Sequence, residues 1–166
     1  MQHDRKTNPK GQVMRSVITV AVILLIGVFV LAQGMRDSSS VVSVTAPQSV
    51  HADVGETVTL TVDIDIDKSW HLYAHGDTVY YGISVAGLDT LPLAAVKVSY
   101  PKGHRGKFLG NSVQLLAGTE TLTISGVLMS PLDEPLKFEL ECQACDDKSC
   151  LAPAWIPFQT VVLPKE

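Results

Sequence analysis

The strict alternation of apolar and polar residues over 57–67 constrains the fold of this chain more than any other feature of the sequence. Single Thr or Asp residues separate its apolar members, which are Val58, Leu60, Val62, Ile64 and Ile66. Successive side chains of a β-strand point to opposite faces, so this period of two predicts a strand with one buried and one hydrated face. Further alternating runs lie near residues 41–46, 93–100, 119–129, 136–142 and 155–163.

Clusters of Gly, Pro, Asn and Asp separate these runs. Pro101-Lys102-Gly103 and the segment 131–135 are two examples, and such clusters favour turns. No segment after residue 36 has a convincing helical period. Six or more short strands within about 125 residues predict an all-β fold, an immunoglobulin-like antiparallel β-sandwich. We assign residues 55–166 to this domain and expect Trp70 and Trp155 in its core.

An uncharged segment at 16–35 predicts one N-terminal transmembrane or signal helix ahead of the sandwich. Residues 1–15 carry four basic residues and one acidic residue, whereas residues 37–166 carry eight basic and sixteen acidic residues. By the positive-inside rule, 1–15 is a basic cytoplasmic arm and the sandwich lies on the periplasmic or extracytoplasmic face of the membrane. The length of the apolar segment favours a retained single-pass anchor, although Val30-Leu31-Ala32 also suits a cleaved signal.

The residues that follow the apolar segment complete this organisation. We expect residues 36–54 to form a tether and the first strand, with Asp37–Ser40 as the polar tether. Disulfides can form and persist outside the cytoplasm. The excess of acidic residues after residue 36 repels phosphate backbones and argues against a nucleic-acid partner.

All three cysteines lie within nine residues, between 142 and 150. Strand parity places Cys142 on the same face as Phe138 and Leu140, which predicts a small buried core thiol that forms no disulfide. Cys145 and Cys150 bracket a four-residue loop and can form a disulfide if the loop folds back. A bridge across so short a loop stabilises the fold by only about 2 kcal/mol. The spacing therefore suits a redox role and a structural role equally well.

Three other interpretations, a thioredoxin-like motif, a zinc site and a calcium site, are weaker. A thioredoxin-like Cys142-x-x-Cys145 motif needs a helix N-terminus to lower a thiol pKa, and the context here is a β-strand. A zinc site would need a His, and none lies in the cysteine loop. The aspartates of 63–67 alternate as a solvent face would and lack the glycine and distal glutamate of a calcium loop. We therefore predict no metal and no cofactor.

Several motifs in order along the chain resemble the N-terminal domain of the DsbD family of thiol:disulfide interchange proteins. They are Trp70–Tyr73, Tyr100–Gly103, Gln143–Asp147, Cys150 and Pro153, and the resemblance covers roughly residues 55–163. It implies an immunoglobulin-like domain with one redox-active pair that relays electrons to oxidised extracytoplasmic client proteins, as in cytochrome c biogenesis. The implied electron donor is a membrane-embedded or thioredoxin-like protein.

The resemblance also implies roles for individual residues. Cys145 and Cys150 match the redox pair, Phe108 matches an aromatic cap over it, and His71 and Tyr73 match positions that line the site. Taken by itself, Phe108 suits a core aromatic equally well.

The chain also departs from the family pattern. Gly106 and Lys107 stand where acidic residues often precede the cap, and Cys142 stands where an aromatic is usual. Because the chain ends at Glu166 without further domains, we expect the donor to be a separate polypeptide. The alternative function is a non-catalytic immunoglobulin-like interaction module in which Cys145 and Cys150 form a structural disulfide.

Charges near the pair predict which sulfur reacts. Asp146 and Asp147 follow Cys145 directly and disfavour its thiolate, whereas Cys150 lies two residues from Lys148. Thiolate character should therefore concentrate on Cys150. We expect Cys150 to form the bond to a partner protein and Cys145 to resolve it.

Overall fold

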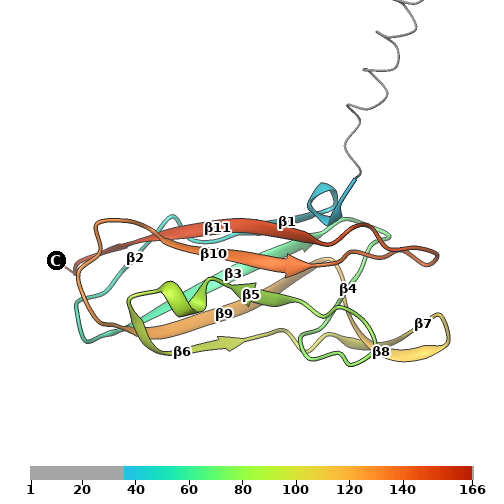
Figure 1. Cartoon of the computed structure of the whole chain (residues 1–166), viewed down its shortest axis with the longest axis horizontal. Helices are drawn as coiled ribbons and strands as arrows, with labels where there is room; N and C mark the ends of the chain where they lie inside the picture. The colour runs from blue at the N-terminus through green and yellow to red at the C-terminus, as the bar shows by residue number, and fades with distance from the viewer. Residues whose placement is uncertain (1–35, 166) are drawn as a thin grey trace, which may run out of the picture. The chain divides into compact units, whose positions relative to one another are not determined.

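The computed structural model describes residues 36–165, so the basic arm 1–15 and the predicted membrane segment 16–35 lie outside the described residues. Strands β1 to β11 and two short 3-10 helices, η1 and η2, form the domain (Figure 1). In chain order they are η1 (Ser38–Ser40), β1 (Val42–Thr45), β2 (Ser49–His51), β3 (Thr57–Ile66), β4 (Leu72–Tyr73), β5 (Ser84–Ala86), η2 (Leu88–Thr90), β6 (Leu93–Ser99), β7 (His104–Phe108), β8 (Asn111–Leu116), β9 (Thr119–Leu128), β10 (Leu136–Cys142) and β11 (Ala154–Leu163). Within residues 36–165, no helix has the length and apolarity needed to cross a membrane.

Two four-stranded sheets make up the sandwich, and the prediction of an all-β, immunoglobulin-like fold is confirmed. The first sheet has the order β1-β3-β9-β6, and the second has the order β2-β11-β10-β5. A third, three-stranded sheet, β4-β8-β7, extends one end of the domain (Figure 1). The pairs are antiparallel except that β2 runs parallel to β11.

The alternation that predicted β3 becomes the inner face of the sandwich. Every second residue of this strand is buried, from Val58 to Ile66, and the residues between them are exposed. The inner faces of both sheets meet in one core cluster, where Phe138 of β10 stacks on Phe158 of β11 with ring centroids 5.1 Å apart. Packing of two alternating faces in this way gives the core of a sandwich. On the outer face, Asp63 accepts a hydrogen bond from the Thr121 hydroxyl at 3.0 Å.

The prediction that Trp155 lies in the core is wrong. Trp155 opposes Glu141 across the β10–β11 pair, on the outer face, and 54% of its surface is exposed. Its indole Nε1 donates to the Glu141 carboxylate at 3.0 Å. The large aromatic side chain favoured burial, whereas the register of β11 turns Ala154 and Phe158 inward and Trp155 outward.

The segment expected to be a polar tether, Asp37–Ser40, lies in one compact unit with the strands. Asp37 caps η1 by accepting a hydrogen bond from the Ser39 amide at 3.0 Å, and Ser38 is fully buried. Residues 36–54 also contain two short strands, β1 and β2, where one was expected. A serine hydroxyl can enter a core when backbone groups satisfy its hydrogen bonds, and Ser38 meets this condition.

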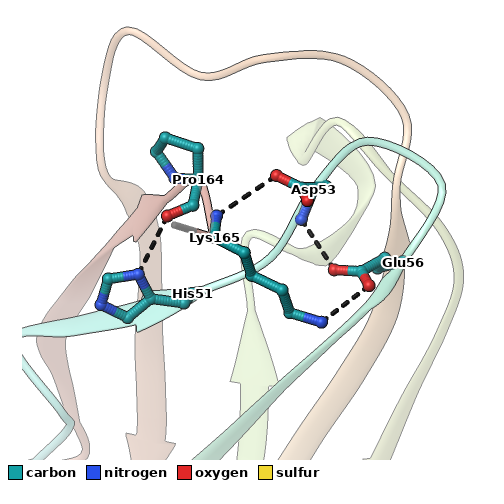
Figure 2. Close-up of polar contacts among 5 residues, drawn as sticks. All are labelled: His51, Asp53, Glu56, Pro164 and Lys165. Atoms are coloured by element: carbon teal, nitrogen blue, oxygen red, sulfur yellow. Dashed lines mark hydrogen bonds and ion pairs between the residues drawn. The ribbon is translucent and has the colours of Figure 1, made fainter.

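Polar contacts fasten the last described residues at the end of β11 (Figure 2). Lys165 Nζ lies 2.7 Å from Glu56 Oε1, and the Lys165 amide donates to Asp53 Oδ1 at 3.2 Å. The Lys165 side chain, followed by the Asp53 backbone amide, lowers the pKa of Glu56. His51 Nδ1 lies 3.0 Å from the carbonyl oxygen of Pro164. The cysteine loop joins β11 at its opposite end, at Ala154.

Candidate functional site

The connection between β10 and β11 carries the cysteines. Cys142 is the last residue of β10, fully buried and free, and it belongs to the same core cluster as Phe138 and Leu140. The parity prediction is therefore confirmed. Burial, with a smaller contribution from the negative charge of Asp37, raises the pKa of Cys142 to about 12. Such a thiol stays protonated and is a poor nucleophile at neutral pH.

Alkylation should distinguish Cys142 from the pair. In the oxidised, native protein we expect maleimide to leave Cys142 unmodified, and in denaturant we expect one thiol per chain to react, because unfolding exposes the buried thiol and returns its raised pKa to the ordinary value. Mass spectrometry of the labelled protein reads the result. Rapid labelling of Cys142 without denaturant would contradict the burial of this side chain.

Cys145 and Cys150 form a disulfide with Cα atoms 4.0 Å apart. The loop between them folds back because the Asp146 amide donates to the Ser149 carbonyl at 2.8 Å. Asp146 Oδ1 also accepts from the amides of Lys148 and Ser149, at 2.8 and 2.7 Å. These two backbone bonds, the Lys148 bond first, lower the pKa of Asp146. A side chain that binds its own backbone in this manner is a strong turn former.

The two sulfur-bearing residues have opposite exposure. Cys145 is fully buried, whereas Cys150 is exposed. Two backbone hydrogen bonds hold Cys145 against His71. The His71 amide donates to the Cys145 carbonyl at 2.9 Å, and the Cys145 amide donates to the His71 carbonyl at 3.0 Å. The disulfide therefore has one sheltered residue and one residue at the surface.

A small aromatic cluster, separate from the main core, surrounds Cys145. Its buried members are Tyr73, Phe108, Val113 and Cys145, and Tyr80 packs against them. The Phe108 ring contacts the rings of His71, Tyr73 and Tyr80 edge-on, with centroids 5.4, 5.9 and 5.2 Å apart. The structure thus brings together all five residues that the sequence singled out: His71, Tyr73, Phe108, Cys145 and Cys150.

Burial in this cluster changes the ionisation of its polar members. Burial lowers the pKa of His71, and the nearby negative charges of Asp147 and Asp146 oppose this shift. Burial also raises the pKa of Tyr73, to which the charge of Tyr80 adds. His71 Nε2 lies 3.4 Å from the Tyr73 hydroxyl. Both rings are therefore held neutral at pH 7.

Sequence reasoning missed Tyr80. Its ring stacks on Tyr73 with centroids 4.6 Å apart, and its hydroxyl lies 3.4 Å from the Phe108 carbonyl oxygen. Tyr80 belongs to no strand, and Asp77 Oδ1 fixes its backbone by accepting from the Tyr80 amide at 3.0 Å. The only signal for this residue was an Asp followed three residues later by a Tyr in an irregular segment, which many loops share.

A tight hairpin presents Phe108. Strands β7 and β8 pair from His104↔Leu115 to Phe108↔Asn111, and Leu109 and Gly110 form the turn with φ of 46° and 86°. Two positive φ values in a two-residue turn match the twist of the flanking strands. The β7–β8 hairpin and the cysteine loop lie at the same end of the domain (Figure 1).

Packing bears on one departure from the family pattern. A Cβ atom at position 106 would overlap a methyl carbon of Leu115, so the Leu115 side chain would have to move to admit a larger residue at 106. Nothing in the structure explains Lys107, whose side chain is exposed.

An immunoglobulin-like sandwich that carries a half-exposed disulfide under an aromatic cluster suits a thiol–disulfide interchange domain. The family model described as "Thiol:disulfide interchange protein DsbD, N-terminal" matches residues 39–157. This match covers most of the chain, so the chain belongs to the family of DsbD N-terminal domains.

Solved structures that are similar to this chain have low sequence identity to it. The N-terminal periplasmic domain of ScsB from Proteus mirabilis matches with a TM-score of 0.56 and 11% identity, over 76% of this chain and 48% of that one. The chain therefore spans about half the length of that structure. The reduced N-terminal domain of DsbD from Neisseria meningitidis matches with a TM-score of 0.43 and 19% identity, over 74% and 85% of the two chains. No curated protein matches the chain.

Proposed function

We propose that this chain is an extracytoplasmic thiol:disulfide interchange domain in which Cys145 and Cys150 alternate between disulfide and dithiol. The unequal exposure of the pair carries this proposal. A partner thiol can reach the exposed Cys150, while Cys145 lies under Phe108 and its neighbours. A structural disulfide needs neither an exposed sulfur nor an aromatic cover, and a bridge across so short a loop contributes little to stability.

The reduction step begins at Cys150. A thiolate of the donor attacks the Cys150 sulfur, the Cys145–Cys150 bond breaks, and Cys145 leaves as a thiolate that takes up a proton. A second donor thiol then attacks the mixed disulfide and releases Cys150 as a thiolate. The domain gains two electrons and the donor is left with one disulfide. His71 and Tyr73 line the sheltered side of the site and, being neutral, add no charge beside Cys145.

The oxidation step runs in the reverse sense on a client. The Cys150 thiolate attacks a client disulfide and forms a mixed disulfide, and the client's other sulfur leaves as a thiolate. Cys145 then attacks Cys150, restores the intramolecular bridge and frees the reduced client. Lys148 in the loop favours the Cys150 thiolate, whereas Asp146 and Asp147 disfavour charge on Cys145.

The partners and location belong to the same proposal. The donor is a membrane-embedded or thioredoxin-like protein, and the clients are oxidised extracytoplasmic proteins, including those of cytochrome c biogenesis. Residues 16–35 anchor the domain as a single span with 1–15 in the cytoplasm, and 36–166 act at the periplasmic face. The charge asymmetry around 16–35 supports this orientation, and the ScsB domain of matching fold is described as periplasmic.

Electron transfer from a thioredoxin-like protein tests the proposal. The oxidised full-length chain is mixed with a reduced thioredoxin-like protein, quenched with acid, and its thiols are counted by maleimide gel shift. We expect two new thiols per chain, with the same result for Cys142→Ala, because Cys142 takes no part in exchange. If the pair stays oxidised while a small exposed control disulfide is reduced, the structural-disulfide alternative is correct.

A further inference from the structure

Ser38 is one of two buried serine or threonine residues among residues 36–165, and the exchange chemistry does not use it. The other is Thr160, whose hydroxyl donates to the Pro47 carbonyl at 2.7 Å. Ser38 begins η1, far from the cysteines in sequence. A buried hydroxyl at this position needs an explanation because polar groups enter a core only with partners.

The hydroxyl of Ser38 joins the two ends of the cysteine loop. Its Oγ donates to the Ala152 carbonyl at 2.8 Å and accepts from the Ala144 amide at 2.8 Å. The Ser38 amide donates to the same Ala152 carbonyl at 3.0 Å. Ala144 directly precedes Cys145, and Ala152 follows Cys150 by two residues. We call these three residues, Ser38, Ala144 and Ala152, the Ser38 clasp.

Other bonds at the base of the loop are local. The Leu151 amide donates to the Ala144 carbonyl at 2.9 Å, and the Gln143 side chain donates to the Leu151 carbonyl at 3.0 Å. The clasp differs because it fixes both ends of the loop to a third segment of the chain. Removal of the Ser38 hydroxyl would leave the buried Ala144 amide without its acceptor.

We propose that Ser38 is a positioning residue for the redox pair, and that the clasp keeps the two ends of the loop together when the disulfide is open. In the disulfide state, the S–S bond itself joins these ends. In the dithiol state, only hydrogen bonds do so, and the clasp keeps the two thiols at a high effective concentration. The clasp therefore favours closure of the disulfide. This inference rests on the proposed function, because it needs a pair that opens and closes.

The equilibrium with glutathione tests the clasp. Two glutathione thiols become one glutathione disulfide, while the Cys145–Cys150 bond breaks and each sulfur takes up a proton. In the full-length Ser38→Ala chain, we expect the equilibrium constant for closing the disulfide to fall about fivefold, because the open loop of the variant gains backbone freedom that closure must then remove. The reduced fraction at each glutathione ratio is measured by acid quench and alkylation.

Thr160→Val is the matched control, because it also removes a buried hydroxyl but lies toward the opposite end of β11 from the loop. We expect the wild-type equilibrium constant for this variant. The proposed role of the clasp would be overturned if both variants shifted the equilibrium constant equally. It would also be overturned if Ser38→Ala caused no shift while the wild type exchanged normally. Neither result would contradict the proposed function. A wild-type pair that does not exchange at all would instead overturn the proposed function.

Hydrogen exchange in the wild-type chain gives a test that needs no variant. We expect the Ala144 amide to be protected from exchange in both the disulfide and the dithiol state, because its acceptor, Ser38 Oγ, does not depend on the S–S bond. Loss of this protection on reduction, with the strands still protected, would show that the clasp opens with the disulfide and would overturn the inference.

Discussion

A Cys145→Ala chain should accumulate a mixed disulfide through Cys150, and a Cys150→Ala chain should not. In the first variant, the exposed Cys150 thiolate attacks the protein sulfur of a mixed disulfide between a one-cysteine partner and 2-nitro-5-thiobenzoate, and 2-nitro-5-thiobenzoate leaves as a thiolate. Neither protein then has a second thiol that could resolve the bond, so the adduct persists. In the second variant, the remaining thiol is the fully buried Cys145, which a partner disulfide cannot reach.

Both variants are made in a Cys142→Ala background, so that each chain has one thiol. The probe is a thioredoxin-like protein with a single active-site cysteine, supplied as its mixed disulfide with 2-nitro-5-thiobenzoate, and adducts are detected on non-reducing gels after acid quench and alkylation. We expect nearly all of the adduct in the Cys145→Ala chain. Adducts confined to the Cys150→Ala chain would reverse the roles of the two sulfurs, and adducts in neither would favour a structural disulfide.

Truncation of Phe108 should expose the pair with little loss of stability. Phe108 is 5% exposed and belongs to the small cluster around Cys145, outside the main core. We expect Phe108→Ala to increase the rate at which the reduced pair reacts with a small disulfide reagent by about tenfold, because access limits a buried thiol. The loss of unfolding free energy should stay below the roughly 3–5 kcal/mol typical of a core Phe→Ala change.

Phe158→Ala is the matched control for this prediction. Phe158 is a buried phenylalanine of the main core that stacks on Phe138 and does not belong to the cluster around Cys145. We expect this variant to lose about 3–5 kcal/mol of unfolding free energy and to keep the wild-type thiol reactivity in its folded fraction. If Phe108→Ala shows a large loss of stability with unchanged reactivity, Phe108 is an ordinary core residue and not a cap.

Local patterns predicted the parts of the fold that depend on strand parity. The alternation of β3 and the inward position of Cys142 both follow from the period of two, because each side chain's face is set by its neighbours in sequence. The Cys145–Cys150 pairing came from the family resemblance together with a spacing that permits a closed loop.

Features that depend on long-range contacts could not be predicted in this way. The outward position of Trp155 follows from the register between β10 and β11. The position of Tyr80 against the cluster around Cys145 follows from an irregular loop held by Asp77. The Ser38 clasp joins groups more than 100 residues apart in sequence, and a serine in a run of three serines carries no local sign of burial. The sequence pattern near each of these residues is compatible with several tertiary environments.

The reduction potential of the pair tests the central claim most directly. The full-length chain is equilibrated at pH 7 in buffers whose ratio of thiol to disulfide sets the redox potential. The fraction of chains with Cys145 and Cys150 reduced is measured by acid quench and alkylation. A pair that relays electrons should titrate as a reversible two-electron couple with a midpoint above about −300 mV, within reach of thioredoxin-like donors. A pair that stays closed until well below about −300 mV would be a structural disulfide and would contradict the proposed function.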